Sequence, residues 1–387
     1  MAKTTYKKKV INGKEYYFYR LRHKNIRKPK DIYGSTVKEL DAKIKNITKE
    51  LDNNITDNKK YYGAFLKDWL YNTHMVNKKP STNERYDGIF RNYIDNSPIF
   101  EIRLKDLSAS DIQKYYNSLI SKGKSIATIK NLHKIISPSI RYAYDNNMVI
   151  KDFSRAIVIP KEKEEKRLKK VKKVEPFTLE EQMQFIEVIK GHELEMLFIT
   201  ALNTGLRQGE LFALTWNDID FKTSCINVNK SYKSVKNIST GKYESIIQTP
   251  KTNKSIRLVP IPVPLVNKLK QHKLVQKAQR LKMANLYENN TLVFCNKFGK
   301  YLDSGNVLKK FKKILKNNDL KDRKFHDLRH TYATRLFELG ENPKTVQDLL
   351  GHSNISITLD TYTHVLESMK KKAVSKLNDL YISMGVK

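Results

Sequence analysis

The sequence predicts a multi-domain α+β protein with a small β-rich N-terminal module, a helical bundle, and a mixed, mainly helical domain that contains a small antiparallel sheet. Its 387 residues exceed the roughly 250 that a single hydrophobic core usually holds together. The hydrophobic pattern also changes along the chain, from alternation near the N-terminus to helical spacing and then to a mixture of both. A charged run at 160–177, almost without apolar residues, predicts a linker between the second and third parts.

Residues 1–57 are predicted to form a three-stranded sheet with one helix. The dipeptide Asn12-Gly13 lies between two β-prone runs, which is typical of a hairpin turn. A helix from Thr36 to about Leu51 should follow, with Ser35 or Thr36 as its N-cap. A basic, aromatic sheet can lie in a DNA major groove, although a lysine-rich adaptor that binds nothing specific would have the same composition. The candidate DNA contacts are Lys7, Lys9, Tyr17, Tyr19, Arg20 and Arg22.

Residues 58–159 are predicted to form a separate bundle of four or five helices. Their aromatic residues recur at helical spacing, which favours a role in the core over stacking on bases. Lys124, in a loop of this bundle, and Lys169 and Lys170, in the linker, are further candidate DNA contacts. The linker could equally be a solvated connection that touches nothing.

Residues 178–387 should form the third domain, which begins with Thr178 as a helix N-cap. Alternating runs at 225–228, 246–247 and 256–259 predict strands among its helices. Cys225 and Cys295 form no CxxC pair, so we expect neither a disulfide nor a zinc site. The chain shows no membrane-length apolar run and no signal peptide, so we expect a cytoplasmic, nucleoid-associated bacterial protein with no membrane partner.

The formal net charge of +34 predicts a polyanionic partner. Lysine supplies 59 of the 74 basic residues and arginine only 15. An AT-rich genome would also enrich lysine, so charge alone cannot identify the partner. An AT-rich genome does not explain, however, why acidic residues are so outnumbered.

Histidine, arginine and tyrosine gather near the C-terminus, in the segments 326–330, 350–352 and 361–364. Imidazole, guanidinium and phenol groups together can bind a phosphate, move protons around it and attack it without a metal ion. Paired guanidiniums, here Arg207 and Arg329, would stabilise the charge that builds up on a phosphodiester in its transition state. The sequence offers no paired carboxylates spaced for two magnesium ions, so we expect neither a metal nor another cofactor.

The stretch 202–211 resembles the first catalytic box of the tyrosine recombinases, the family of phage and conjugative-transposon integrases. The segments 249–252, 326–330 and 350–362 match the later boxes in the same order, so the resemblance covers residues 178 to about 370. It implies an arm-type DNA-binding domain at 1–57, a core-binding domain at 58–159 and a catalytic domain at 178–387. The catalytic residues that it implies are Arg207, Lys251, His326, Arg329, His352 and Tyr362, with Glu210 in support.

The resemblance also implies a role for each residue. Tyr362 would form a covalent 3′-phosphotyrosine and His326 would assist removal of its proton, while His352 would donate a hydrogen bond to the phosphate. Lys251 would protonate the departing 5′ oxygen, although the nearby Lys242 and Lys254 compete for this role. Glu210 would orient a catalytic group, or form an ordinary surface pair. We expect His330 off the face that His326 and Arg329 share, as a supporting or packing residue.

By the same resemblance, the partners would be double-stranded DNA attachment sites of a mobile element and further copies of the chain. A homo-tetramer would form on DNA through the C-terminal tail, unless this tail packs on its own domain. An accessory excision factor or a host DNA-bending protein is a further possible partner. Two other functions remain open, a type IB topoisomerase-like enzyme and a non-catalytic DNA-binding regulator.

Overall fold

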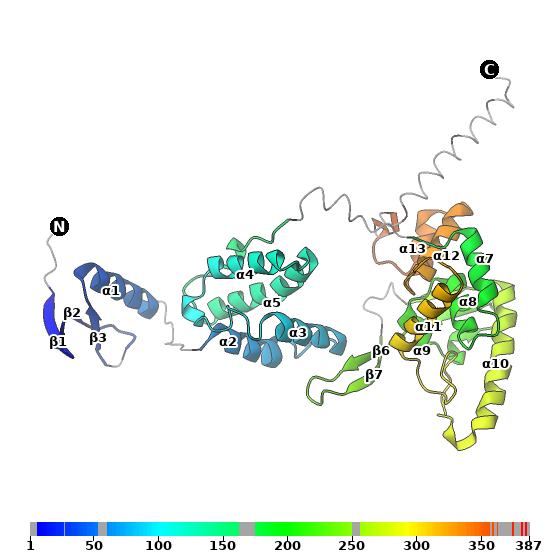
Figure 1. Ribbon diagram of the computed structural model, residues 1–387, viewed down its shortest axis with the longest axis horizontal. Helices are drawn as coiled ribbons and strands as arrows, with labels where there is room; N and C mark the ends of the chain where they lie inside the picture. The colour runs from blue at the N-terminus through cyan, green and yellow to red at the C-terminus, as the bar shows by residue number, and fades with distance from the viewer. Residues whose placement is uncertain are drawn as a thin grey trace. The chain divides into compact units, whose positions relative to one another are not determined.

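The computed structural model (Figure 1) describes residues 6–26, 28–52, 60–161, 175–249 and 256–356, together with 358, 359, 362, 374, 381 and 384. The chain folds into two compact units. The first spans Met1–Lys170, and the second spans Val171–Lys387 apart from the turn Asn237–Gly241. The chain is mainly helical and contains small antiparallel sheets, which confirms the predicted α+β class.

The first unit begins with an antiparallel sheet of β1 (Lys7–Ile11), β2 (Lys14–Leu21) and β3 (Lys30–Gly34), in that order. Asn12 and Gly13 have φ angles of 46° and 76°, the left-handed values that a two-residue hairpin turn requires. Helix α1 (Val37–Asp52) follows. Its Leu40 packs with Leu21 and Ile32 in a small buried core.

The two faces of this sheet differ in what covers them. Tyr17 contacts the core under α1, and Tyr19 lies on the same face because it pairs with the buried Ile32. Residues that alternate with these two, among them Phe18, point to the opposite, open face. The candidate aromatics Tyr17 and Tyr19 therefore lie on the helix side, whereas Phe18 and Tyr33 lie on the open side with their ring centroids 5.4 Å apart.

A helical bundle forms the rest of the first unit. Its helices are α2 (Tyr62–Trp69), which continues as the π-helical turn η1 (Leu70–His74), then α3 (Pro80–Tyr93), α4 (Ala109–Ser121) and α5 (Ile126–Asp145). Phe90 and Tyr116 are buried in its core, in agreement with their helical spacing. Single 3₁₀ turns, η2 (Leu104–Asp106) and η3 (Ser154–Ala156), lie in the connections.

The described part of the second unit contains seven α-helices, which pack around a large core and a smaller one between the last two helices. The seven are α7 (Leu179–Val188), α8 (Glu195–Thr204), α9 (Gln208–Ala213), α10 (Val263–Met283), α11 (Ser304–Asn317), α12 (Asp327–Glu338) and α13 (Pro343–Leu350). The rings of Phe185, Phe198 and Phe311 meet at the centre, with centroids 5.5 to 5.7 Å apart. Thr178 caps α7 through a capping box with Glu181, as its position predicts.

Two small antiparallel sheets flank these helices. One joins β4 (Ile219–Asp220), β5 (Cys225–Val228) and β8 (Arg257–Pro260), and the other is a hairpin of β6 (Ser231–Lys236) and β7 (Tyr243–Gln248). The sequence does not predict β6, because its buried residues Tyr232 and Val235 are three positions apart and break the alternation. Lys251, between β7 and β8, lies outside the described residues, as do Lys169, Lys170 and most of the tail.

None of the described helices is both long and apolar enough to cross a lipid bilayer.

Candidate active site

A sharp corner between α8 and α9 sets the position of Arg207. Helix α8 ends at Gly205, which is left-handed with a φ of 60°. A Cβ on Gly205 would lie 2.5 Å from the ring of Tyr332, so only glycine fits the corner. The chain then turns, and Arg207 becomes the N-cap residue of α9.

Glu210, one turn into α9, holds Arg207 by two contacts. Its carboxylate accepts a hydrogen bond from the Arg207 backbone N–H at 2.9 Å and another from Arg207 Nη1 at 2.8 Å. The Glu210 side chain is 8% exposed, whereas that of Arg207 is 39% exposed. The pair is therefore an anchored guanidinium with one open side, and not a surface ion pair.

A second arginine, Arg257 on β8, binds the same carboxylate. Its Nη1 and Nη2 lie 3.2 and 2.9 Å from the two oxygens of Glu210, and its side chain is 6% exposed. Burial alone would raise the pKa of Glu210. The hydrogen bond and charge of Arg257, with the charge of Arg207, outweigh burial and lower this pKa to about 2.

Arg329 lies on α12 and is buried. Its Nη1 donates to the carbonyl of Gly205 at 2.7 Å, so it also fixes the corner before Arg207. Burial first, and then the charge of Arg207, lowers the pKa of Arg329 to about 9. The guanidinium stays charged at neutral pH, which leaves a strong field in a site of low dielectric constant.

The C-terminal end of α13 joins the three arginines. Its last carbonyl groups would otherwise lack partners, and they carry the negative end of the helix dipole. Three successive carbonyl oxygens each accept from a different guanidinium: Leu349 from Arg257 Nε at 2.7 Å, Leu350 from Arg329 Nη2 at 2.5 Å, and Gly351 from Arg207 Nη2 at 3.3 Å. The arginines thus fix the end of α13 and, with it, the segment that carries His352.

His352 directly follows Gly351, the left-handed C-cap of α13. Its Nδ1 lies 2.8 Å from the hydroxyl of Thr358. Burial, and then the charge of Arg329, lowers the pKa of His352 to about 3, so the ring is neutral. With Thr358 donating to Nδ1, Nε2 carries the hydrogen and can donate to a phosphate oxygen.

His326 precedes α12 as its N-cap residue, and its ring meets that of His330 edge to face, with centroids 4.8 Å apart. Burial, followed by the charges of Arg329 and Arg207, lowers the pKa of His326. From the spacing we expect His330 off the face that His326 and Arg329 share. That expectation is wrong, because the His330 ring contacts the His326 ring. One turn of helix brings it beside His326.

Tyr362 is completely buried and forms a hydrogen bond with His330. Its hydroxyl oxygen lies 2.8 Å from His330 Nδ1. Burial, and then the charges of His326 and Arg329, lowers the pKa of His330 to about 4. Burial raises the pKa of Tyr362, while the charge of Arg329 opposes this rise. The phenol therefore keeps its proton and shares a hydrogen bond with the neutral imidazole.

The second unit thus brings five of the six predicted catalytic residues and the supporting carboxylate into one network, namely Arg207, His326, Arg329, His352, Tyr362 and Glu210. The sixth, Lys251, lies outside the described residues. Sequence reasoning missed Arg257 and the contact of His330 with Tyr362. Alternation on β8 offered one signal, because it places Arg257 on the same face as the buried Val259.

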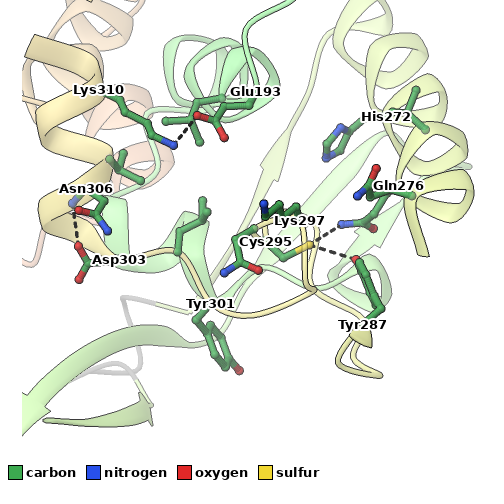
Figure 2. Close-up of a pocket in the computed structure, with 16 residues that line it drawn as sticks. Glu193, His272, Gln276, Tyr287, Cys295, Lys297, Tyr301, Asp303, Asn306 and Lys310 are labelled. Atoms are coloured by element: carbon green, nitrogen blue, oxygen red, sulfur yellow. Dashed lines mark hydrogen bonds and ion pairs between the residues drawn. The ribbon is translucent and has the colours of Figure 1, made fainter. Parts of the chain in front are cut away.

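The cavity of about 410 Å³ shown in Figure 2 lies apart from this network. Helix α10 lines it with His272 and Gln276, and Cys295 Sγ lies 3.1 Å from Gln276 Nε2 and 3.2 Å from the Tyr287 hydroxyl. None of its lining residues belongs to the cluster of arginines and histidines. Within the described part of the chain, no group of three histidine, cysteine or acidic side chains could hold a metal ion.

Chemically, this network can bind an anion and exchange a proton. Arg207 has an open side and a fixed guanidinium, and His352 can donate from Nε2 when Thr358 donates to its Nδ1. The phenol of Tyr362 lies beside the imidazole of His330. This set fits attack of a phenol on a phosphodiester.

Comparison with known proteins agrees with this chemistry. Residues 172–369 match the phage integrase family, and residues 62–120 match the N-terminal SAM-like domain of phage integrases. A tyrosine recombinase XerC-like protein of Caldanaerobacter subterraneus subsp. tengcongensis is 42% identical, covering 98% of this chain and 99% of that protein. The ICEBs1 integrase of Bacillus subtilis is 32% identical over 54% of this chain and 55% of its own length.

Solved structures share the fold. The Tn1549 transposon integrase in complex with circular intermediate DNA superposes with a TM-score of 0.61 at 20% identity, covering 79% of this chain and 98% of that one. A lambda integrase tetramer bound to a Holliday junction gives a TM-score of 0.54 at 20% identity, covering 89% and 92%. From the extent of these matches, the chain belongs to the phage integrase family of tyrosine recombinases.

Proposed function

We propose that this recombinase integrates and excises a mobile element by cutting and rejoining DNA through a covalent 3′-phosphotyrosine at Tyr362. One observation carries the proposal: Tyr362 lies against His330, within the field of the buried Arg329, at the end of a network that also holds Arg207 and His352. These side chains come from segments far apart in the sequence.

Each group has a role that follows from its position. Arg207 and Arg329 bind the non-bridging oxygens of the phosphodiester and stabilise the charge that develops on them. His352 donates from Nε2 to the same phosphate. Lys251 follows β7 and precedes β8, close in sequence to Arg257, and we assign it the protonation of the departing 5′ oxygen. The phosphotyrosine keeps the energy of the broken bond, so rejoining requires no ATP.

The burial of Tyr362 has a consequence for this mechanism. A phenol with no exposed surface cannot reach a phosphorus atom of a DNA duplex. The segment that carries Tyr362 must therefore shift when DNA binds. The phosphate would then replace part of the contact between Arg207 and the Gly351 carbonyl, whose 3.3 Å length makes it the weakest of the three arginine contacts.

We further propose that DNA contacts the open face of the N-terminal sheet. Lys9 Nζ lies 5.7 Å from the centre of the Phe18 ring and 5.8 Å from that of Tyr33, so a cation and two aromatic rings lie together. Lys7 shares this face, because it pairs with Phe18. Arg20 also lies there, although Asp31 binds its guanidinium.

Outside the sheet face, we retain Arg22 and Lys124, both exposed, as candidate DNA contacts. Lys169 and Lys170 stay candidates from the sequence alone.

The partners in this proposal are paired double-stranded attachment sites and three further copies of the chain. The lambda integrase tetramer on a Holliday junction supports this assembly, because it has the same fold. The C-terminal tail would join neighbouring copies, and an accessory excision factor or a host DNA-bending protein would set the direction. The protein would work on DNA in the bacterial cytoplasm, associated with the nucleoid.

Replacement of Tyr362 by Phe tests the proposal. The probe is a nicked duplex that carries the junction between the element's end and its flanking DNA, with the nick placed so that the cut strand is released. The wild-type chain should accumulate a covalent adduct, which denaturing gel electrophoresis detects. Tyr362→Phe should bind the duplex equally well and form no adduct. An adduct that persists in this variant would reassign the nucleophile.

A further inference from the structure

We propose that His330, and not His326, accepts the phenol proton of Tyr362 during strand cleavage. The inference rests on the proposed function, since it assumes that Tyr362 is the nucleophile. It assigns a reacting role to a residue that neither its spacing nor the resemblance singles out.

The geometry of the two imidazoles differs. His330 Nδ1 lies 2.8 Å from the Tyr362 hydroxyl oxygen, a normal hydrogen-bond distance for proton transfer. The Tyr362 ring also meets the His330 ring at 5.8 Å and the Phe337 ring at 5.4 Å, so the phenol is held by packing as well. His326 packs edge to face on the His330 ring, with the two centroids 4.8 Å apart.

The charges around His326 indicate a different task. Arg329 and Arg207 lower the pKa of His326 after burial, and His326 is more exposed than His330. A neutral, exposed imidazole can donate a hydrogen bond to an oxygen of a phosphate that the guanidiniums bind. The two histidines of α12 and its N-cap would thus divide the work, with His326 toward the phosphate and His330 toward the phenol.

The proton balance is complete with these groups. As the Tyr362 segment shifts and Oη approaches phosphorus, its proton passes along the hydrogen bond already present in the free protein to His330 Nδ1, and the ring becomes an imidazolium with Nε2 already protonated. Tyr362 Oη then forms its bond to phosphorus. The bond between phosphorus and the 5′ oxygen breaks, and that oxygen takes a proton from the general acid that we assign to Lys251. Rejoining reverses each step, and His330 returns its proton to the phenolate.

The same arrangement explains why the proton stays on Tyr362 before DNA binds. Burial and the nearby guanidinium make the imidazolium unfavourable in the free protein. A phosphodiester between Arg207 and Arg329 would offset that positive charge and strengthen His330 as a base. Proton transfer would therefore depend on the substrate, and Tyr362 would not ionise when no DNA is bound.

Two substitutions separate proton transfer from simple packing. His330→Asn keeps an acceptor oxygen close to the position of Nδ1 but has no basic nitrogen, whereas His330→Ala removes both. With the nicked duplex, we expect adduct formation in both variants to slow by about 100-fold or more, the usual contribution of a general base. Wild-type rates in His330→Asn would overturn the proposal, because a hydrogen bond alone would then suffice. Faster adduct formation in His330→Ala would also overturn it and make His330 a restraint on Tyr362.

A more acidic phenol provides the second measurement. Trifluorotyrosine placed at position 362 ionises at a lower pH than tyrosine and depends less on a base. It should recover most of the activity lost in His330→Asn and little of that lost in His326→Ala. Recovery of His326→Ala alone would return the role to His326, and recovery of neither variant would show that His330 acts only through folding.

Two controls show whether a loss of activity comes from misfolding or from failure of the proposed function. The bundle holds a second tyrosine–histidine pair, with the Tyr116 hydroxyl 3.1 Å from His133 Nδ1. His133→Asn loses a comparable buried contact and should leave the adduct rate per bound DNA unchanged. If the wild-type chain forms no adduct that depends on Tyr362, the proposed function fails. The pairing is then tested without DNA, because the ¹⁹F resonance of 3-fluorotyrosine at 362 should shift in His330→Ala, and an unshifted resonance would contradict the contact.

Discussion

At the scale of single residues, burial decides which charges the site holds. Glu210 remains ionised although it is buried, because two guanidiniums bind its oxygens. His330 and His352 remain neutral, because burial and the nearby Arg329 guanidinium act together against a further positive charge. The free protein therefore holds charged guanidiniums next to neutral imidazoles, as the proposed binding of a phosphate and transfer of a proton require.

The lowered pKa of His330 predicts how stability depends on pH. The unfolded chain binds a proton at this residue near pH 6.5, whereas the folded chain binds it only near pH 4. Between these values the unfolded state holds more protons, so the stability of the folded state falls as pH falls. Lowering the pH from 7 to 5 should cost about 2 kcal/mol at this residue.

Urea unfolding at pH 7 and pH 5 measures this cost. The chain has two tryptophans, Trp69 in the first unit and Trp216 in the second, so a Trp69→Phe background makes fluorescence report the second unit alone. His330→Asn should lose about 2 kcal/mol of the pH dependence that its parent shows. An equal pH dependence in both chains would contradict the neutral, buried state of His330.

At the scale of elements, the site lies where the ends of four helices meet. Helix α8 ends at Gly205, α9 begins at Arg207, α12 begins after His326, and α13 ends at Gly351. Unpaired backbone groups at these ends would be costly if buried, and the arginines satisfy them. The side chains that would bind the phosphate are therefore also those that hold the elements together.

Arg257 links three of these elements, because it joins β8 to Glu210 on α9 and to the Leu349 carbonyl on α13. Arg257→Met would leave a buried carboxylate with one partner fewer and should destabilise the second unit by about 3–5 kcal/mol. Adduct formation should also fall by about tenfold or more, because Arg207 loses a fixed anchor.

The matched control is Arg280→Met on α10, where an exposed guanidinium donates only to the Asn289 side chain among the contacts shown by the structure. This change should alter stability by less than about 1 kcal/mol. Urea unfolding followed through Trp216 measures both variants. Equal effects of the two substitutions would mean that the buried link contributes nothing beyond a surface contact.

Much of this site can be predicted from the sequence, and the rest depends on tertiary contacts. Arg207, His326, Arg329, His352 and Tyr362 stand out because rare arginines and histidines recur in three of the four boxes, which follow a fixed order. Arg257 stands out less, because an arginine in a strand is usually exposed and only its alternation with Val259 indicates burial. The contact of His330 with Tyr362 spans 32 positions, and no local pattern encodes such a distance.

At the scale of the whole molecule, two units of different character share one excess of positive charge. The alternation of β1 and β2 predicts the first sheet, but which of its faces α1 covers depends on packing. The sequence therefore predicts Tyr17 and Tyr19 as DNA contacts without showing which face α1 covers. In the structure Tyr17 lies on the face that α1 covers, and Phe18 lies on the open face, where we propose that DNA contacts the sheet.

The two faces of the N-terminal sheet provide the last prediction. Lys7 and Lys9 lie on the open face, whereas Lys8, between them, lies on the face of Tyr17 and pairs with Glu15 at 2.9 Å. If the open face binds DNA, each of the two outer lysines neutralises a phosphate and releases a counterion. The logarithm of the affinity falls with the logarithm of the salt concentration, by about 0.9 for each phosphate neutralised on duplex DNA.

Fluorescence anisotropy with a labelled duplex of the element's end region, over a range of salt concentrations, measures these slopes. Lys7→Gln together with Lys9→Gln should make the slope shallower by about 1.8, and Lys8→Gln should leave it unchanged. Each substitution removes one lysine and one positive charge. The variants therefore differ, per residue, only in the face of the sheet on which the lysine lies. If Lys8→Gln lowers the slope as much per residue as the other two, the positive charge acts as a diffuse field and the sheet presents no defined DNA-binding face.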